Sequence, residues 1–233
     1  MKRDIGLAWL ELPLVPPVPS VEKIEANCVA EVAVVSAKNY SNPFMEVELD
    51  AVVTRPDGNQ LRVPGFWAGG KDWHIRYASD QLGTHTWRTE CSDAANSGLH
   101  GIAGKIEVVP SRGENPLSQH GSIGVAKDSH HFEHADGTPF LWLADTWWKC
   151  LCKRMTWEGF QELTADRKAK GFSVVQIVCG PYPDEDFFQP SLENEGGQPY
   201  LAKDLSVVNP TYFEYADRRV KHLVDAVSVP AIV

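Results

Sequence analysis

The hydrophobic pattern changes its period at a polar stretch near the middle of the chain, and this change constrains the possible folds most. Before the stretch, short runs of alternating apolar and polar residues are separated by turn residues, as over residues 44–54 followed by 56–59. Such alternation is typical of strands with one buried face. After the stretch, continuous apolar runs alternate with helical stripes, which indicates parallel β/α units. The sequence therefore predicts two domains of different classes.

The first predicted domain spans residues 21–110 and is all β. Its short strands are expected over residues 28–37, 44–54, 60–66, 73–78, 84–91 and 105–109. Strands of this length with turn signals between them predict a two-sheet β-sandwich, whose core Trp67, Trp73 and Trp87 are expected to fill.

Residues 1–20 are expected to be an extended lead-in to this domain. The segment contains four prolines, and two acidic residues interrupt its apolar run. No small-x-small cleavage site is recognised, so we do not interpret the segment as a signal peptide, and a cytoplasmic location is favoured.

The second predicted domain spans residues 122–233, after a polar, turn-rich linker over residues 111–121. We expect strands over residues 140–144, 173–179 and 229–233, a helix over 156–170, and a second helix that begins at Asn209-Pro210. This order fits the first three strands and two helices of a (β/α)₈ barrel, or a doubly wound sheet. No glycine-rich phosphate motif follows either of the first two strands, which disfavours nucleotide binding.

Charge and composition limit the partners. The net charge is −9 without a basic patch, so nucleic acid is not expected, and no apolar run is long enough to span a membrane. Cys28 and Cys91 lie in predicted strands, where either a disulfide or two buried free thiols is possible; we prefer free thiols. No cofactor is expected, and no metal site is predicted at His130, His131 and His134, because adjacent residues of a strand face opposite sides.

Several stretches also resemble a known family. They are HADGTPFLWLADTWW (134–148), FQELTADRKAKGFSVVQIV (160–178), NEGG (194–197) and NPTYFEYADRRVKHLVD (209–225). In these stretches the chain resembles the apiosidase-like glycoside hydrolases, a TIM-barrel family that acts on plant cell-wall sugars. Members often carry an immunoglobulin-like sandwich in front, and residues 21–110 resemble it through VPGFWAGG (63–70), WHIRY (73–77) and residues 83–87.

The resemblance implies a hydrolase of side chains on plant cell-wall polysaccharides, with an oligosaccharide or polysaccharide as partner. It also implies catalytic carboxylates on later barrel strands, beyond Val233. A full barrel takes about 250 residues, so we expect a C-terminally truncated chain that is inactive alone, with no catalytic residue of its own. The alternatives are a non-catalytic carbohydrate-binding protein and an incomplete gene product without activity.

Candidate substrate-binding residues follow the predicted barrel strands, because barrel active sites lie at the carboxyl ends of strands. Asp145 ends the first strand and is either a ligand for sugar hydroxyls or a carboxylate that accepts from backbone N–H groups of the next turn. Trp147 and Trp148 follow it. One of the two rings is a possible stacking surface for a sugar, and the other, which points the opposite way, is expected to pack beneath the helices.

The long loop over residues 180–208 is the second source of candidates. Asp184, Asn194 and Glu195 are predicted substrate ligands, whereas a solvated acidic loop is the alternative for residues 184–186. Gln176 is interpreted as part of a polar layer inside the barrel. Residues 217–219 are interpreted as surface ion pairs on the second helix.

Overall fold

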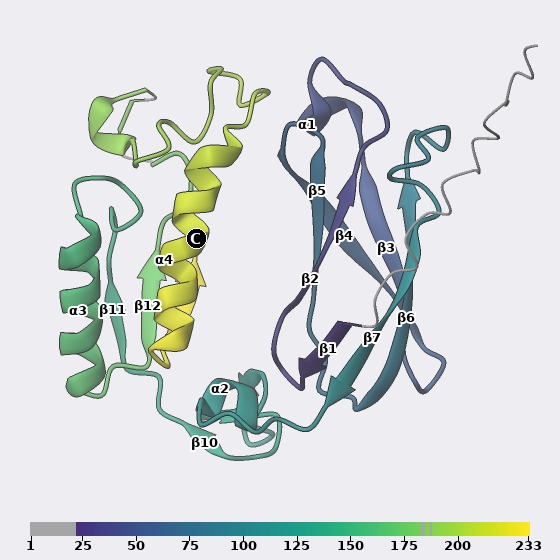
Figure 1. Ribbon diagram of the computed structural model, residues 1–233. Helices are drawn as coiled ribbons and strands as arrows, with labels where there is room; N and C mark the ends of the chain where they lie inside the picture. The colour runs from purple at the N-terminus through teal and green to yellow at the C-terminus, as the bar shows by residue number, and fades with distance from the viewer. Residues whose placement is uncertain (1–21, 183–184, 187) are drawn as a thin grey trace, which may run out of the picture.

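The computed structural model describes residues 22–182, 185–186 and 188–233, so the predicted lead-in lies outside the described residues. The described part is mostly β, with thirteen strands and four α-helices (Figure 1). Two bodies lie side by side in Figure 1, one built from strands and the other from a small parallel sheet with helices. Within the described ranges no helix has both the length and the apolar character needed to cross a membrane.

The first body is one seven-stranded sheet with the order β1-β7-β6-β3-β4-β5-β2. Its strands are β1 Glu22–Glu25, β2 Ala30–Val35, β3 Leu49–Thr54, β4 Gln60–Gly69, β5 Asp72–Tyr77, β6 Gly83–Cys91 and β7 Ala103–Val109. Strand β4 pairs with β3 through its first half and with β5 through its second half. It therefore joins the two parts of the sheet.

Side chains from both parts of this sheet share one hydrophobic core. Trp73 and Ile75 of β5 pack with Val53 of β3 and Ile106 of β7, and none of the four is more than 3% exposed. Such burial is the main favourable contribution to folding. Trp73 and Trp87 lie in the core as predicted, and Trp67 packs against it while partly buried.

Cys28 and Cys91 form no disulfide, in agreement with the preferred alternative. Cys91 is buried, and burial raises the pKa of its thiol. The expected strand over 44–54 begins later than predicted, because Pro43 starts a short helix, α1 Pro43–Glu46, before β3. Proline is well suited to the first position of a helix.

The predicted linker and the residues after it form a small connecting unit. It contains helix α2 Pro116–Gln119 and an antiparallel sheet of β8 Ile123–Val125, β9 Phe132–His134 and β10 Pro139–Phe140. Asp136-Gly137 forms the hairpin turn between β9 and β10, as its sequence indicates.

The strand predicted over residues 140–144 is wrong. Phe140 ends β10, and Leu141, Trp142 and Leu143 are 75%, 45% and 38% exposed between two different sheets. The first parallel strand, β11 Ala144–Thr146, starts only at the end of this apolar run. A continuous apolar run indicates burial only where elements cover both of its faces, and here they do not.

The second body is a parallel sheet in the order β11-β12-β13, with β12 Val174–Ile177 and β13 Val229–Ile232. Helices α3 Trp157–Ala169 and α4 Pro210–Asp225 connect the strands in the predicted order. Val175 and Ile177 of β12 pack against Phe160 of α3 and Leu223 of α4. Both helices therefore cover the same face of the sheet.

The two helix starts were predicted from their caps, and only one cap forms as expected. The Thr156 hydroxyl accepts from the Gly159 N–H at 3.1 Å. Asn209 precedes α4 as predicted, but its side chain instead donates to the carbonyls of Gly196 and Gln198 at 2.9 and 2.7 Å. Pro210 at the first helical position therefore defines the start of α4 without a side-chain cap.

Replacing Ile106 with Ala tests the core of the first body. Ile106 is 1% exposed, so the lost methylenes and the cavity left behind should lower the free energy of unfolding by about 2–5 kcal/mol. Lys105→Ala on the same strand is the control and should change it by less than about 0.5 kcal/mol, because Lys105 is exposed. If urea titrations gave equal losses of unfolding free energy for Ile106→Ala and Lys105→Ala, this assignment of the core would be wrong.

Candidate functional site

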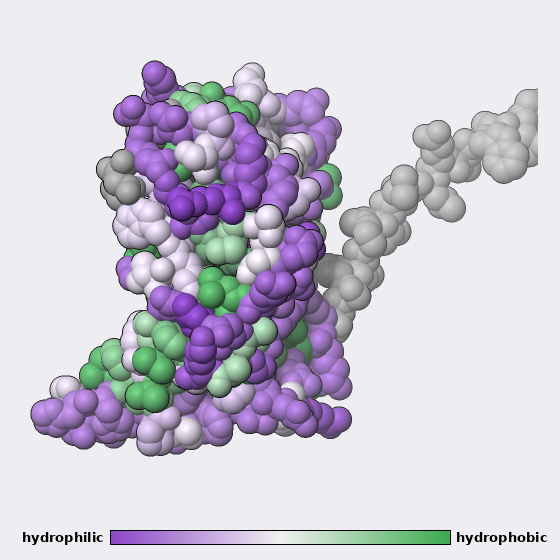
Figure 2. Space-filling model, turned by 90° about the vertical axis from the view of Figure 1, so that its left-hand side faces the viewer, coloured by the Kyte–Doolittle hydropathy of each residue, from purple (hydrophilic) through white to green (hydrophobic). Residues whose placement is uncertain are grey.

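The carboxyl ends of the three parallel strands meet at one edge of the second body. The loop after β11 and the long loop after β12 rise from this edge, above α3 and α4 in Figure 1. A groove of about 660 Å³ lies here, lined by Asp145, Thr146, Trp147, Trp148, Lys149, Cys150, Arg154, Met155, Leu163 and Arg167. The side of the molecule that is at left in Figure 1 is mostly hydrophilic, with hydrophobic patches at mid-height and near the bottom (Figure 2).

Strand register places Asp145 and Thr146 on opposite faces of the sheet. Asp145 is paired with Val175, which packs against the helices, whereas Thr146 is paired with Gln176. The Thr146 hydroxyl donates to the Gln176 Oε1 at 3.4 Å on the face away from the helices. Gln176 therefore belongs to a polar pair on that face, and Asp145 lies on the helix-facing side.

Asp145 is held by three donors. Its Oδ2 accepts from Arg167 Nε at 2.5 Å and from Trp147 Nε1 at 3.1 Å, and its Oδ1 accepts from the Thr146 N–H at 2.9 Å. Burial acts to raise the pKa of Asp145, but the hydrogen bonds from Arg167, Trp147 and Thr146 outweigh it and hold the pKa below its usual value. A carboxyl group of this kind is ionised at neutral pH and is unsuited to donate a proton.

The two tryptophans after β11 have different surroundings. Trp147 is 6% exposed and meets the ring of Phe160 edge to face at a centroid distance of 5.5 Å. Trp148 is 38% exposed and lines the groove. Trp147 thus packs with α3, while Trp148 presents ring surface at the groove, and contact of either with a sugar stays a prediction.

Within the long loop, Asn194 is buried and holds the backbone, whereas Asp184 lies outside the described residues. The Asn194 Nδ2 donates to the Tyr212 carbonyl at 2.8 Å, and its Oδ1 accepts from the Gly196 N–H at 2.8 Å. Gly196 packs so closely that an added Cβ would lie 2.4 Å from the Thr211 carbonyl oxygen. This end of the loop is therefore fastened tightly to the start of α4.

Arg219 was interpreted as a surface residue, and this interpretation is wrong, because Arg219 is 2% exposed. Its Nη1 donates to the carbonyls of Cys150 and Cys152, and its Nη2 donates at 2.9 Å both to the Met155 carbonyl and to Glu195 Oε1. One guanidinium thus joins α4 to the loops after β11 and β12. Helical spacing contained the signal, since Arg219 lies three residues after Ala216 and four before Leu223, which are both buried.

The acidic side chains described around this edge pair with basic ones. Asp145 pairs with Arg167, Glu185 with Lys149, Glu193 with Lys153 and Glu195 with Arg219. The Lys149 ammonium also lies 5.8 Å from the ring centroid of the buried Tyr182. Each of these four carboxylates therefore has a basic partner, and this arrangement suits binding and orientation.

The fold of the second body defines a segment of a parallel β/α domain with its loops at the carboxyl edge. Residues 126–233 match the family "Apiosidase-like, catalytic domain", and residues 23–92 match "Domain of unknown function (DUF5060)". The chain thus carries a match to DUF5060 followed by a match to the apiosidase-like catalytic domain, and the predicted family is confirmed.

One solved structure shares the fold of this chain. A proposed glycoside hydrolase from Bacteroides vulgatus ATCC 8482 is similar with a TM-score of 0.69 and 21% identity, over 91% of this chain and 41% of that chain. A family 5 glycoside hydrolase from the same organism has a TM-score of 0.37 and 17% identity, over 54% and 27% of the two chains. This chain therefore spans less than half the length of these proteins. No match was found among curated protein sequences.

Replacing Arg219 with Ala tests its role in joining the loops. The change removes the donor for three carbonyls and for Glu195, so we expect a loss of about 3–5 kcal/mol in the free energy of unfolding. Its neighbour Arg218 is exposed and stacks on Trp157, so Arg218→Ala should cost only about 0.5–1 kcal/mol. If urea titrations gave similar losses of unfolding free energy for the two variants, the hydrogen bonds of Arg219 would contribute little to stability.

The carboxyl titration of Asp145 tests its ion pair. Because the folded pKa is lowered, the stability that Asp145 contributes is present above its unfolded pKa and is lost as the pH falls through the folded pKa. In ¹³C NMR the carboxyl midpoint should lie below the ordinary value of 3.8, and Arg167→Ala should move it upward. A midpoint at or above 3.8 in the unmodified chain would refute the assigned pairing.

Proposed function

We propose that the protein to which this chain belongs is a glycoside hydrolase that acts on side chains of plant cell-wall polysaccharides. The observation that carries the proposal is the match to an apiosidase-like catalytic domain over residues 126–233, which include all three parallel strands and the loops at their carboxyl ends. In barrel enzymes substrates are bound at this edge.

The proposal includes the finer description of both bodies. We propose that residues 122–233 are the first three strands and two helices of a (β/α)₈ barrel, because β11, α3, β12, α4 and β13 follow one another in this order and the three strands are parallel. We propose that residues 21–110 are an immunoglobulin-like sandwich, because both parts of the seven-stranded sheet face one core.

Some residues of the predicted site are proposed to contact the sugar, and others to position the residues that do. Trp148 and Glu195 keep 38% and 37% of their surface exposed, so they are the proposed sugar contacts among the described residues. A tryptophan face packs well on the apolar face of a sugar ring, and a carboxylate accepts hydrogen bonds from hydroxyls. Asp145, Trp147 and Asn194 are proposed to position the strand ends and loops that carry these contacts.

The chemistry of glycoside hydrolysis requires one protonated and one ionised carboxyl group on either side of the bond. The four carboxylates described at the strand ends are ion-paired, and the pKa values of Asp145 and Glu193 are lowered by their basic partners, so neither of these two is suited to act as the acid. We therefore propose that this segment contributes substrate binding and that hydrolysis by the 233-residue chain is negligible.

Binding and product release, measured on the same samples, test the proposal. We expect neutral plant cell-wall oligosaccharides to shift NMR signals of the loops after β11 and β12, with no released sugar detected by chromatography. Trp148→Ala should weaken this binding roughly three- to tenfold, which corresponds to the loss of one aromatic stacking contact.

Trp142→Ala is the matched control, because Trp142 is also exposed but lies outside the groove and packs on Phe132 and Phe140. Its binding should equal that of the unmodified chain. Binding that is insensitive to Trp148 would contradict the proposed site, and rapid sugar release by this chain would contradict the proposed lack of hydrolysis.

A further inference from the structure

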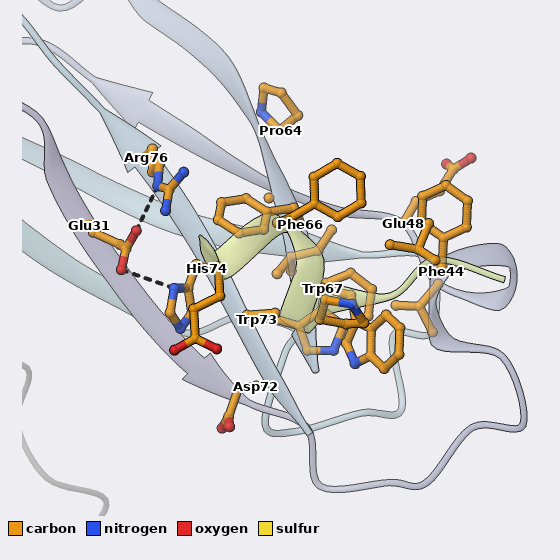
Figure 3. Close-up of a pocket in the computed structure, with 18 of the residues that line it drawn as sticks. Glu31, Phe44, Glu48, Pro64, Phe66, Trp67, Asp72, Trp73, His74 and Arg76 are labelled. Atoms are coloured by element: carbon orange, nitrogen blue, oxygen red, sulfur yellow. Dashed lines mark hydrogen bonds and ion pairs between the residues drawn. The ribbon is translucent and has the colours of Figure 1, made fainter. Parts of the chain in front are cut away.

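A second groove lies between the two bodies. It occupies about 870 Å³ between the outer face of the β2-β5-β4 part of the sheet and helix α4, and both bodies contribute to its lining. Figure 3 shows side chains of the first body that line it. The residues that matter here are Phe66, Asp72, His74 and Arg76 from the sheet and Phe213 and Glu214 from α4. Ligand sites of this size commonly lie between domains.

Strand alternation directs these side chains away from the core. Trp73 and Ile75 of β5 are buried in the core, so the intervening His74 lies on the outer face, where it is the cross-strand partner of Phe66. The register of β4 and β5 shifts just beyond this pair, between Trp67 and Gly69. Such β-bulges occur often beside sites, because they redirect side chains at the end of a strand pair.

An ion-pair network fixes the middle of the groove. Arg76 donates to Glu31 at 2.6 Å and to Asp217 of α4 at 2.5 Å, and the Nδ1 of His74 lies 3.0 Å from Glu31 (Figure 3). The Arg76 guanidinium also lies 4.8 Å from the ring centroid of Phe66. The pair with Asp217 bridges the two bodies, so the groove is held open with its aromatic floor in a defined orientation.

The groove combines exposed rings with acceptors. Phe66 and Phe44 are 36% and 45% exposed, although they are large apolar side chains. Among the described contacts, the carboxylates of Asp72 and Glu214 have no hydrogen-bond or ion-pair partner. Ring faces suit the C–H face of a sugar, and free carboxylates accept from its hydroxyls.

The charge of the lining restricts which sugar fits. Six carboxylates line the groove, from Glu31, Glu48, Asp50, Asp72, Glu214 and Asp217. Asp50 is paired with Arg62 outside the lining, and the lining itself contributes the guanidinium of Arg76. That guanidinium is already shared by two carboxylates. A uronic acid would bring a further negative charge into this lining without a free cation to pair with it, and like charges repel.

We propose that this groove is a non-catalytic binding site for a neutral oligosaccharide, separate from the groove at the strand ends. The two grooves share no lining residue, and helix α4 contributes Phe213, Glu214 and Asp217 to the groove between the bodies alone. The inference rests on the proposed function for its ligand class. It assigns the DUF5060 domain a part in holding substrate.

Titration of the 233-residue chain with two matched probes tests the site. The probes are a neutral arabino-oligosaccharide and an oligogalacturonate of the same length, followed by calorimetry and NMR. We expect the neutral probe to bind and to shift signals of β4, β5 and α4, and the acidic probe to bind at least roughly tenfold more weakly, because of the groove's negative charge.

Variants locate the bound probe. Phe66→Ala should weaken binding of the neutral probe roughly three- to tenfold, and so should Asp72→Asn, which keeps the size of the side chain. Leu61→Ala is the control, since Leu61 is an exposed apolar residue of the same strand outside the groove. A thermal unfolding curve for each variant shows whether it retains the fold.

Three results would contradict the inference, each for a different reason. Binding that depends on Trp148 but not on Phe66 would reject this groove while supporting the proposed function at the strand ends. Equal binding of the acidic probe would reject the role of charge. Binding of a cationic probe such as spermidine, sensitive to Phe66 and without binding of the neutral sugar, would show that the groove serves cations instead.

Discussion

The second body depends on one buried cation. Arg219 has only 2% exposure, and its guanidinium donates to three backbone carbonyls after β11 and to Glu195 in the loop after β12. An arginine suits this position because its donors form a rigid planar fork and it stays charged when buried. Without this cation, the carbonyls would be buried without donors, which is costly, and the two loops at the strand ends would lose their common anchor.

Helix α4 connects this anchor to the first body. One of its faces carries Arg219 and packs on the parallel sheet, and another carries Asp217, which pairs with Arg76 across the groove between the bodies. A movement of α4 would therefore affect both the strand-end loops and the aromatic groove.

Local patterns predicted much of this architecture. Thr156 caps α3 as expected. Its hydroxyl accepts from a free N–H group in the first turn of the same helix, so the cap depends only on residues that are close in sequence. Trp73 of β5 and Trp87 of β6 also lie in the core, as their aromatic character predicted. The apolar run over residues 140–144 was misleading, since the same pattern fits a buried strand and an exposed connection, and only neighbouring elements distinguish them. The sequence predicted that one of Trp147 and Trp148 packs beneath the helices, but only the structure shows that this one is Trp147.

The sequence by itself determined the two classes of domain, the order of their elements, and the family, because these follow from periodicity, caps and motifs within short stretches. Only the tertiary structure decided which partner each polar side chain finds. Asp145 meets Arg167 at a separation of 22 residues, Arg219 meets Cys150 at 69, and Arg76 meets Asp217 at 141. Such pairings depend on the packing of whole elements, and packing sets burial, charge and the shape of both grooves.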